Sequence, residues 1–239
     1  MSFLGHIPRV AAPILVAIAL VACGDSEPGQ RKAFISFLQE MNGRPGVHFL
    51  VPTAADEKAF GPYLQHYEIF ADFNKDMQAA TNDYFGHLRQ LGVGPGSTPR
   101  TIEQMAAAPQ DLPAAKDLID KMQQTIEARL AKLIAARNAL VQPDDLKAVY
   151  DKTFAKLVTA PSSALENSIK ALDQGIDSSI KLVAYINTHR NKLTVSGTRI
   201  EAKDQRTLDE LGPLMQAHQQ AGERFAAAQR ESERVLESD

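Results

Sequence analysis

The sequence predicts an all-α fold, an elongated antiparallel bundle of long amphipathic helices with a small β-hairpin before the last helix. Two observations predict it. Apolar residues recur every seven residues along several segments, and short stretches rich in Gly, Pro and polar residues separate these segments. A helix with one apolar stripe must bury that stripe against another element, so several such helices joined by short turns form a bundle.

The clearest stripe lies in the segment that begins near Thr53 and ends at Leu91. Thr53 precedes Asp56 by three residues, the spacing of a capped helix start. The stripe then recurs every seven residues, with further members halfway between. Its members are Tyr63, Phe70, Met77, Tyr84 and Leu91, with Tyr67, Thr81 and Leu88 in the intervening positions.

Similar spacing predicts the other helices of the bundle. A first helix is expected around 30–39 and a second long one around 113–141. A third long helix spans about 165–186, and the last runs from about 204 to 236. These helices alternate in direction if the turns between them are short.

Glycine, proline and β-branched residues mark the ends of these helices. Gly92–Ser97 ends the long aromatic helix, and we interpret it as a linker. Pro143 opens a shorter helix that Pro161 is expected to close, and Gly212–Pro213 is expected to bend the last helix. The β-branched run Leu193–Ile200 surrounds a Ser-Gly pair, which predicts the hairpin.

The chain opens with a targeting signal. One basic residue, Arg9, precedes twelve apolar residues, Val10–Val21, as in a secretory signal peptide. This run is too short to span a hydrocarbon core, which needs about 20 helical residues. The residues Leu20–Cys23 resemble the bacterial lipobox, whose cysteine is lipidated and becomes the mature N-terminus. An ordinary signal peptide with an incidental Cys23 is the alternative.

The lipobox resemblance makes Cys23 the expected lipid-attachment residue, with a diacylglyceryl thioether and an acylated amine of the palmitate type. Residues 1–22 are then the lipoprotein signal peptide, 23–29 a lipidated tether, and 30–239 a single helical domain. Several acyl chains anchor a protein stably to a membrane. Gly24 rather than Asp follows the cysteine, which by the rule for enterobacterial lipoproteins favours the outer over the inner membrane, facing the periplasm.

Composition excludes several other classes of protein. With 26 Lys and Arg against 29 Asp and Glu, the net charge is −3, which argues against a nucleic-acid partner. One Cys cannot form an internal disulfide or a zinc site of several thiolates. We find no phosphate loop, dinucleotide fingerprint or nucleophile elbow, so we expect no cofactor and no catalytic residues.

Three sets of residues could still carry function, and each has a structural alternative. The acidic stripe Asp72, Asp76, Asp83 and His87 shares one helix face and could supply part of a divalent metal site, but a solvated face is the favoured interpretation and we expect no metal. His218 lies on an apolar stripe and could be a buried pH sensor or a ligand contact, although a residue hydrogen-bonded within the core, or one placed where the bundle opens, is more usual. The aromatic set could line a small-molecule pocket, although packing into the core is more usual. Its members are Phe60, Tyr63, Tyr67, Phe70, Phe73 and Tyr84.

Two segments carry a family resemblance. Asp25–Gln39 and the run from Asp144 to Pro161, together with the lipobox cysteine and the hairpin, resemble the YiaF-like family of bacterial lipoproteins, known as domain of unknown function 3053. The likeness extends over nearly the whole chain. It implies a lipidated cell-envelope protein and implies no catalytic residues.

The sequence thus favours a membrane-anchored periplasmic lipoprotein that acts as a non-enzymatic interaction or structural module, with an envelope protein as a possible partner. A helical-bundle protein that binds a small apolar or lipid-like ligand is the alternative. A metal-dependent hydrolase centred on Asp72–His87 is a third hypothesis.

Overall fold

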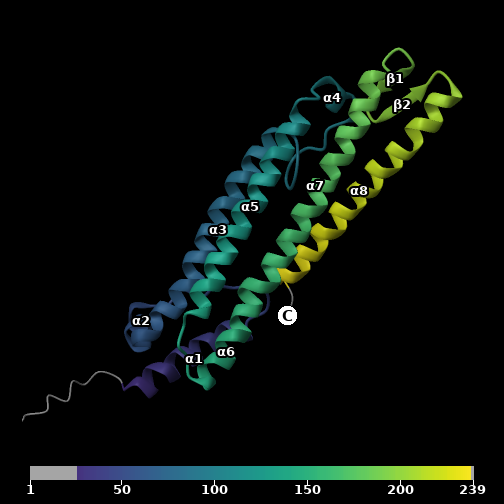
Figure 1. Ribbon diagram of the computed structural model, residues 1–239. Coiled ribbons are helices and arrows are strands. Elements are labelled where there is room, and N and C mark those ends of the chain that lie inside the picture. Colours follow the sequence, from purple (N-terminus) through teal and green to yellow (C-terminus); the bar gives the residue numbers. More distant parts are fainter. Residues whose placement is uncertain (1–25, 238–239) are drawn as a thin grey trace, which may run out of the picture.

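The computed structural model describes residues 26–237, and Cys23 and the predicted signal peptide lie outside them. The described part is an elongated bundle of long helices with one short hairpin (Figure 1). The elements in chain order are α1 Glu27–Gly43, α2 Ala54–Phe60, the 3-10 turn η1 Gly61–Tyr63, α3 Leu64–Gln90, α4 Ile102–Ala107, α5 Asp111–Asn138, α6 Asp144–Phe154, the π-helical turn η2 Ala155–Thr159, α7 Ala160–Thr188, β1 Leu193–Ser196, β2 Arg199–Ala202 and α8 Gln205–Glu237.

The long helices lie side by side in the order α3, α5, α7, α8. Helix α3 packs on α5, α5 on α7, and α7 along most of α8. Helices α1, α2 and α6 gather at one end of the bundle, and α4 and the hairpin lie at the other (Figure 1). This arrangement confirms the predicted all-α, elongated bundle with a hairpin before its last helix.

The core divides into two clusters along the bundle. The cluster at the α1 end is aromatic, with Phe34, Phe60, Phe70 and Tyr150 almost fully buried. The cluster toward the hairpin is mainly aliphatic and is formed by α3, α4, α5, α7 and α8. The seven-residue stripe of α3 runs through both clusters. Its members Tyr63, Tyr67 and Phe70 lie in the aromatic cluster, and Met77 and Leu88 lie in the aliphatic one.

Capping boxes fix two helix starts. The Thr53 hydroxyl accepts from the backbone N–H of Asp56, whose carboxylate accepts in return from the N–H of Thr53, as the sequence predicts. Thr101 and Gln104 form the same box at the start of α4, a short helix that we did not predict. Helix α1 begins at Glu27, inside the stretch expected to be a tether.

The prediction that Pro161 closes a helix is wrong. Helix α6 continues through η2 directly into α7, and Pro161 occupies the first turn of α7. The N–H of Ala160 donates to the carbonyl of Ala155, five residues earlier, so the backbone is locally wider than an α-helix. This wider turn accommodates a proline without a break. Pro213 likewise lies inside α8, which continues through it.

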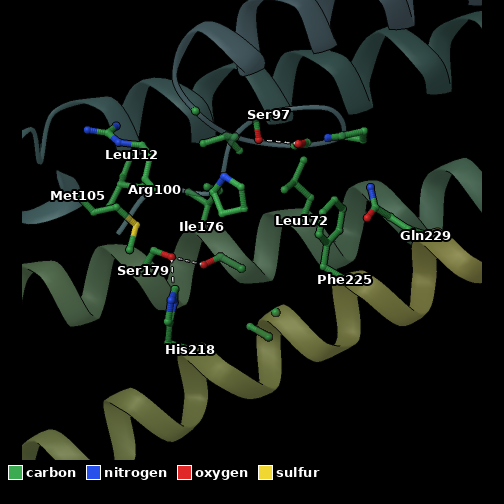
Figure 2. Close-up of a pocket in the computed structure, with 18 of the residues that line it drawn as sticks. Ser97, Arg100, Met105, Leu112, Leu172, Ile176, Ser179, His218, Phe225 and Gln229 are labelled. Carbon is green, nitrogen blue, oxygen red and sulfur yellow. Dashed lines mark hydrogen bonds between the residues drawn. The ribbon is translucent and has the colours of Figure 1, made fainter. Parts of the chain in front are cut away.

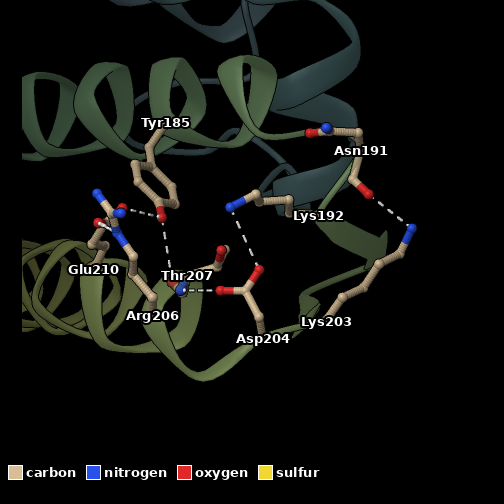
Figure 3. Close-up of polar contacts among 8 residues, drawn as sticks. All are labelled: Tyr185, Asn191, Lys192, Lys203, Asp204, Arg206, Thr207 and Glu210. Atoms are coloured by element: carbon tan, nitrogen blue, oxygen red, sulfur yellow. Dashed lines mark hydrogen bonds and ion pairs between the residues drawn. The ribbon is translucent and has the colours of Figure 1, made fainter.

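The hairpin pairs Leu193 with Ala202 and closes the hairpin end of the α7–α8 pair. Asp204 caps α8 by accepting from the N–H of Thr207 at 2.9 Å, and this bond lowers the pKa of its carboxyl group. The Asp204 carboxylate also lies 3.6 Å from the Lys192 ammonium (Figure 3). Tyr185 of α7 donates across to Glu210 of α8 at 3.1 Å.

Candidate functional site

The acidic stripe on α3 does not form a metal centre in the described residues. Asp72, Asp76, Asp83 and His87 are all exposed and are spread along the helix, and the closest pair, His87 Nδ1 and Asp83 Oδ2, lies 3.8 Å apart. Residues 26–237 contain no group of three or more His, Cys, Asp or Glu side chains placed to hold a metal ion. The stripe is a solvated helix face.

Four members of the aromatic set pack in the core, namely Phe60, Tyr63, Tyr67 and Phe70. Tyr63 and Tyr67 are each 7% exposed, and the Phe34 ring stacks on Tyr63 at 6.1 Å. The phenol hydroxyls are satisfied within the protein, because Tyr63 donates to Glu27 at 2.5 Å and Tyr67 to the carbonyl of Leu50 at 2.9 Å. Burial, together with the Glu27 carboxylate, raises the pKa of Tyr63 to about 12.

A cavity of about 550 Å³ lies elsewhere, between the loop 92–100, α7 and α8. We call it the distal cavity, because it lies toward the hairpin end, away from the chain's N-terminus. Figure 2 shows Leu172 and Ile176 reaching into it from α7 and Phe225 from α8, with Met105 and Leu112 behind. Its volume and its mainly apolar wall are those of a small-molecule site.

Small residues on the two facing helices create this space. Gly175 of α7 and Gly222 of α8 both line the distal cavity, and a Cβ added to either would meet no atom within 4 Å. Ala221 lies beside Gly222 and is fully buried. Glycine has no side chain, so these two residues leave space in the distal cavity that larger side chains would fill. They do so although glycine in a helix interior lowers helix stability.

The loop 92–100, predicted as a linker, forms one wall of the distal cavity. Gly92, Gly94 and Gly96 have φ between 70° and 84°, which turns the chain back over α7. The Arg100 side chain covers Gly92, and its guanidinium donates to Asp111 at 2.7 Å and to the carbonyl of Gln104 at 3.0 Å. The positive charge of Arg100 is therefore already paired with a carboxylate.

His218 and Ser179 form the polar contact of the distal cavity. The Ser179 hydroxyl donates to the carbonyl of Gly175 at 2.8 Å, and its oxygen lies 3.2 Å from His218 Nδ1, a contact whose donor depends on the imidazole tautomer (Figure 2). Burial lowers the pKa of His218, which favours the neutral imidazole. In the tautomer that carries its proton on Nδ1, Nε2 is an acceptor, and no hydrogen bond from a residue of 26–237 to Nε2 is observed.

A second cavity, of about 360 Å³, continues along α7 toward the α1 end. We call it the proximal cavity. It lies between α3, the start of α7 and the end of α8, and it includes part of the aromatic set. Its wall is formed by Phe73, Met77, Thr81, Phe85, Leu157, Pro161, Leu165, Ser232 and Leu236, with others.

The Ser179 hydroxyl donates to the carbonyl of Gly175, whereas a serine activated by histidine donates to the imidazole. The sequence singled out His218, but it gave no indication of Ser179 or of the loop 92–100 as site residues. Glycines inside the helical patterns at 175 and 222 were the available signal.

Together the fold and the cavities define a class of protein, an α-helical bundle with an apolar, ligand-sized cavity between its last two helices. The chain belongs to the family described as "Protein of unknown function (DUF3053)", whose model matches residues 11–233. This confirms the resemblance drawn from the residues. Relatives named "Uncharacterized protein YiaF" from Escherichia coli K12, Escherichia coli O157:H7 and Shigella flexneri are each 28% identical over 221 residues.

The alignment with these relatives covers 91% of this chain and 92% of each of theirs. No solved structure matches the chain significantly. Within the described residues, no helix has the length and apolar character needed to cross a membrane.

Proposed function

We propose that this chain is a lipid-anchored protein of the bacterial cell envelope that faces the periplasm and binds a small, largely apolar ligand in the distal cavity, without catalysing a reaction. The observation that carries the binding role is the cavity of about 550 Å³ with its apolar wall and the His218–Ser179 contact. The lipobox around Cys23 supports the anchor.

The ligand part is tested on the mature protein isolated from its native host. Native mass spectrometry should reveal an added mass that is released on denaturation, and the Gly175→Leu variant should lack it, because the new side chain fills the cavity. The matched control is Gly86→Leu, since Gly86 is also a helix glycine but lines neither cavity. If Gly175→Leu retains the same added mass as the control, binding in the distal cavity is refuted.

The anchor is tested separately through Cys23. Cells fed an alkyne-tagged palmitate should label the wild-type chain and leave Cys23→Ala unlabelled, and intact-mass measurement should show that the mature chain begins at residue 23. Membrane fractionation then decides between the outer membrane, which the sequence favours, and the inner membrane. An unmodified Cys23 in the native host would contradict the anchor and leave the ligand proposal standing.

A further inference from the structure

The distal and proximal cavities lie end to end. On α7 the proximal cavity is lined by residues up to Leu165, and the distal one begins at Leu172, two helical turns further on. On α8 the gap is a single turn, between Ser232 and Gln229. Phe85 of the proximal cavity also lies close to Gly94 of the distal one, because a Cβ on Gly94 would be 3.9 Å from the Phe85 ring.

We call the two cavities taken together the groove; they lie along α7, with α3 and its loop 92–100 on one side and α8 on the other. Pro161 and Ser179 mark its two ends on α7. At 1.5 Å per residue this stretch is roughly 27 Å long. A hydrocarbon core of roughly 30 Å holds two layers of acyl chains, so one chain extends over roughly 15 Å. The groove is therefore long enough for an acyl chain and a head group.

The groove has almost no charge. Among the described residues, no Asp, Glu, Lys or Arg lines the proximal cavity, and the distal cavity has only Arg100 and His218 as ionisable residues. Asp111 neutralises Arg100 at 2.7 Å. A charged head group would thus enter without a free counter-charge, and burying an unpaired charge is costly.

Both cavities have polar wall residues. In the proximal cavity these are Asn74, Gln78, Thr81, Ser162 and Ser232, and the Thr81 hydroxyl is already bonded to the carbonyl of Met77 at 2.8 Å. The distal cavity has the only histidine of the two walls, His218, and Gln219 and Gln229 also line it. An imidazole acceptor at His218 favours a head group at that end, with the chain toward Leu236.

We infer that the groove holds a neutral long-chain lipid whose head group carries a hydroxyl or amide N–H, such as a monoacylglycerol. The head group donates to His218 in the distal cavity, and the acyl chain runs into the proximal cavity. This inference rests on the proposed function and adds the class of the ligand and its direction in the groove.

The test uses photoreactive lipids and the lipidated full-length mature protein in phosphatidylcholine vesicles. A 16-carbon monoacylglycerol with a diazirine at the chain end should label peptides that contain Phe73–Phe85 or Leu157–Leu165 of the proximal cavity. The same lipid with the diazirine next to the carbonyl should label the distal cavity instead. Hexadecyl sulfate and hexadecyl trimethylammonium probes, which are permanently charged, should label at least roughly tenfold less.

Two variants separate the cavities. Ser232→Phe fills the proximal cavity, so it should reduce labelling by the 16-carbon probe and leave an 8-carbon monoacylglycerol probe unaffected. The matched control is Ser163→Phe, because Ser163 lies on the exposed face of the same end of α7. Circular dichroism melting of each variant shows that it is folded.

The outcomes distinguish the inference from the function on which it rests. Labelling confined to the distal cavity by the chain-end probe refutes the continuous groove. Equal labelling by neutral and charged probes refutes the neutral head group. If neither the 8-carbon nor the 16-carbon probes label the distal cavity, the proposed ligand-binding function itself fails.

Discussion

The phenol hydroxyl of Tyr150 donates a hydrogen bond of 3.1 Å to the backbone carbonyl of His66, inside the aromatic cluster where α6 meets α3. Tyr150 is fully buried, and its ring lies 4.6 Å from that of Phe70. Burial raises the pKa of this phenol, so it stays protonated and able to donate at neutral pH.

Removal of this hydroxyl should weaken the α1 end of the bundle. Tyr150→Phe keeps the ring packing and leaves a buried carbonyl with one partner fewer, so the free energy of unfolding should fall by about 1 kcal/mol. Urea denaturation followed by circular dichroism measures this. Tyr150→Ala, which also removes the ring, should cost about 3–5 kcal/mol. Equal losses in the two variants would show that the hydrogen bond, and not the ring, dominates.

Stability should decrease as the solution becomes mildly acidic. Burial lowers the pKa of both His66 and His218 below the ordinary value of 6.5. As the pH falls, the histidines of the unfolded chain therefore bind protons before those of the folded chain. The contribution of the two neutral histidines to the free energy of unfolding is fully present above pH 6.5 and is lost as the pH falls through the pKa values of the folded state. Unfolding measured between pH 8 and 5 should show this loss, and His66→Gln should reduce its slope. An unchanged slope would contradict the role of His66.

Filling the distal cavity with single methyl groups should stabilise the bundle. Gly175→Ala and Gly222→Ala place a Cβ where no atom lies within 4 Å, and alanine favours the helix. Each should raise the free energy of unfolding of ligand-free protein by about 0.5–1 kcal/mol. Thermal melting detects this as an increase in Tm. A decrease in either variant would mean that the glycine is required by the fold rather than by the cavity.

The glycine that begins η1, directly after α2, should respond in the opposite way. Gly61 has φ of 52°, and a Cβ there would lie 2.5 Å from the Gln30 side chain. Gly61→Ala should therefore reduce stability by more than about 1 kcal/mol, because the left-handed conformation is unfavourable for alanine. Gly86→Ala is the control, since its Cβ would approach only the end of the Arg89 side chain, at 3.9 Å. Similar melting temperatures in the two variants would contradict the strain at Gly61.

The sequence predicted the parts of this fold that follow from local periodicity. The seven-residue stripe placed Phe70, Met77 and Leu88 in the core, and the Thr53 cap and the hairpin were also correct. The prediction that Pro161 ends a helix was wrong because a π-helical turn at residues 155–159 accommodates the proline. Such a turn depends on the tertiary packing around it.

The candidate site was harder to predict for a different reason. A cavity lies where side chains from segments far apart in the sequence do not fill the space between them. Local sequence patterns do not predict such a space. From the sequence, the glycines of 92–96 predicted a linker. The ion pair between Arg100 and Asp111, which fixes the position of this loop, is visible only in the three-dimensional structure. His218 could be found because an ionisable residue on an apolar stripe is unusual.

Helix α8 has one main neighbour, α7, and it forms one whole side of the groove. Breaking that single interface would open the groove while the α3–α5 pair stays folded. Entry and exit of a guest molecule would then be a partial unfolding event of the C-terminal helix. On the proposed function, the rate of ligand exchange would therefore depend on the local stability of α8.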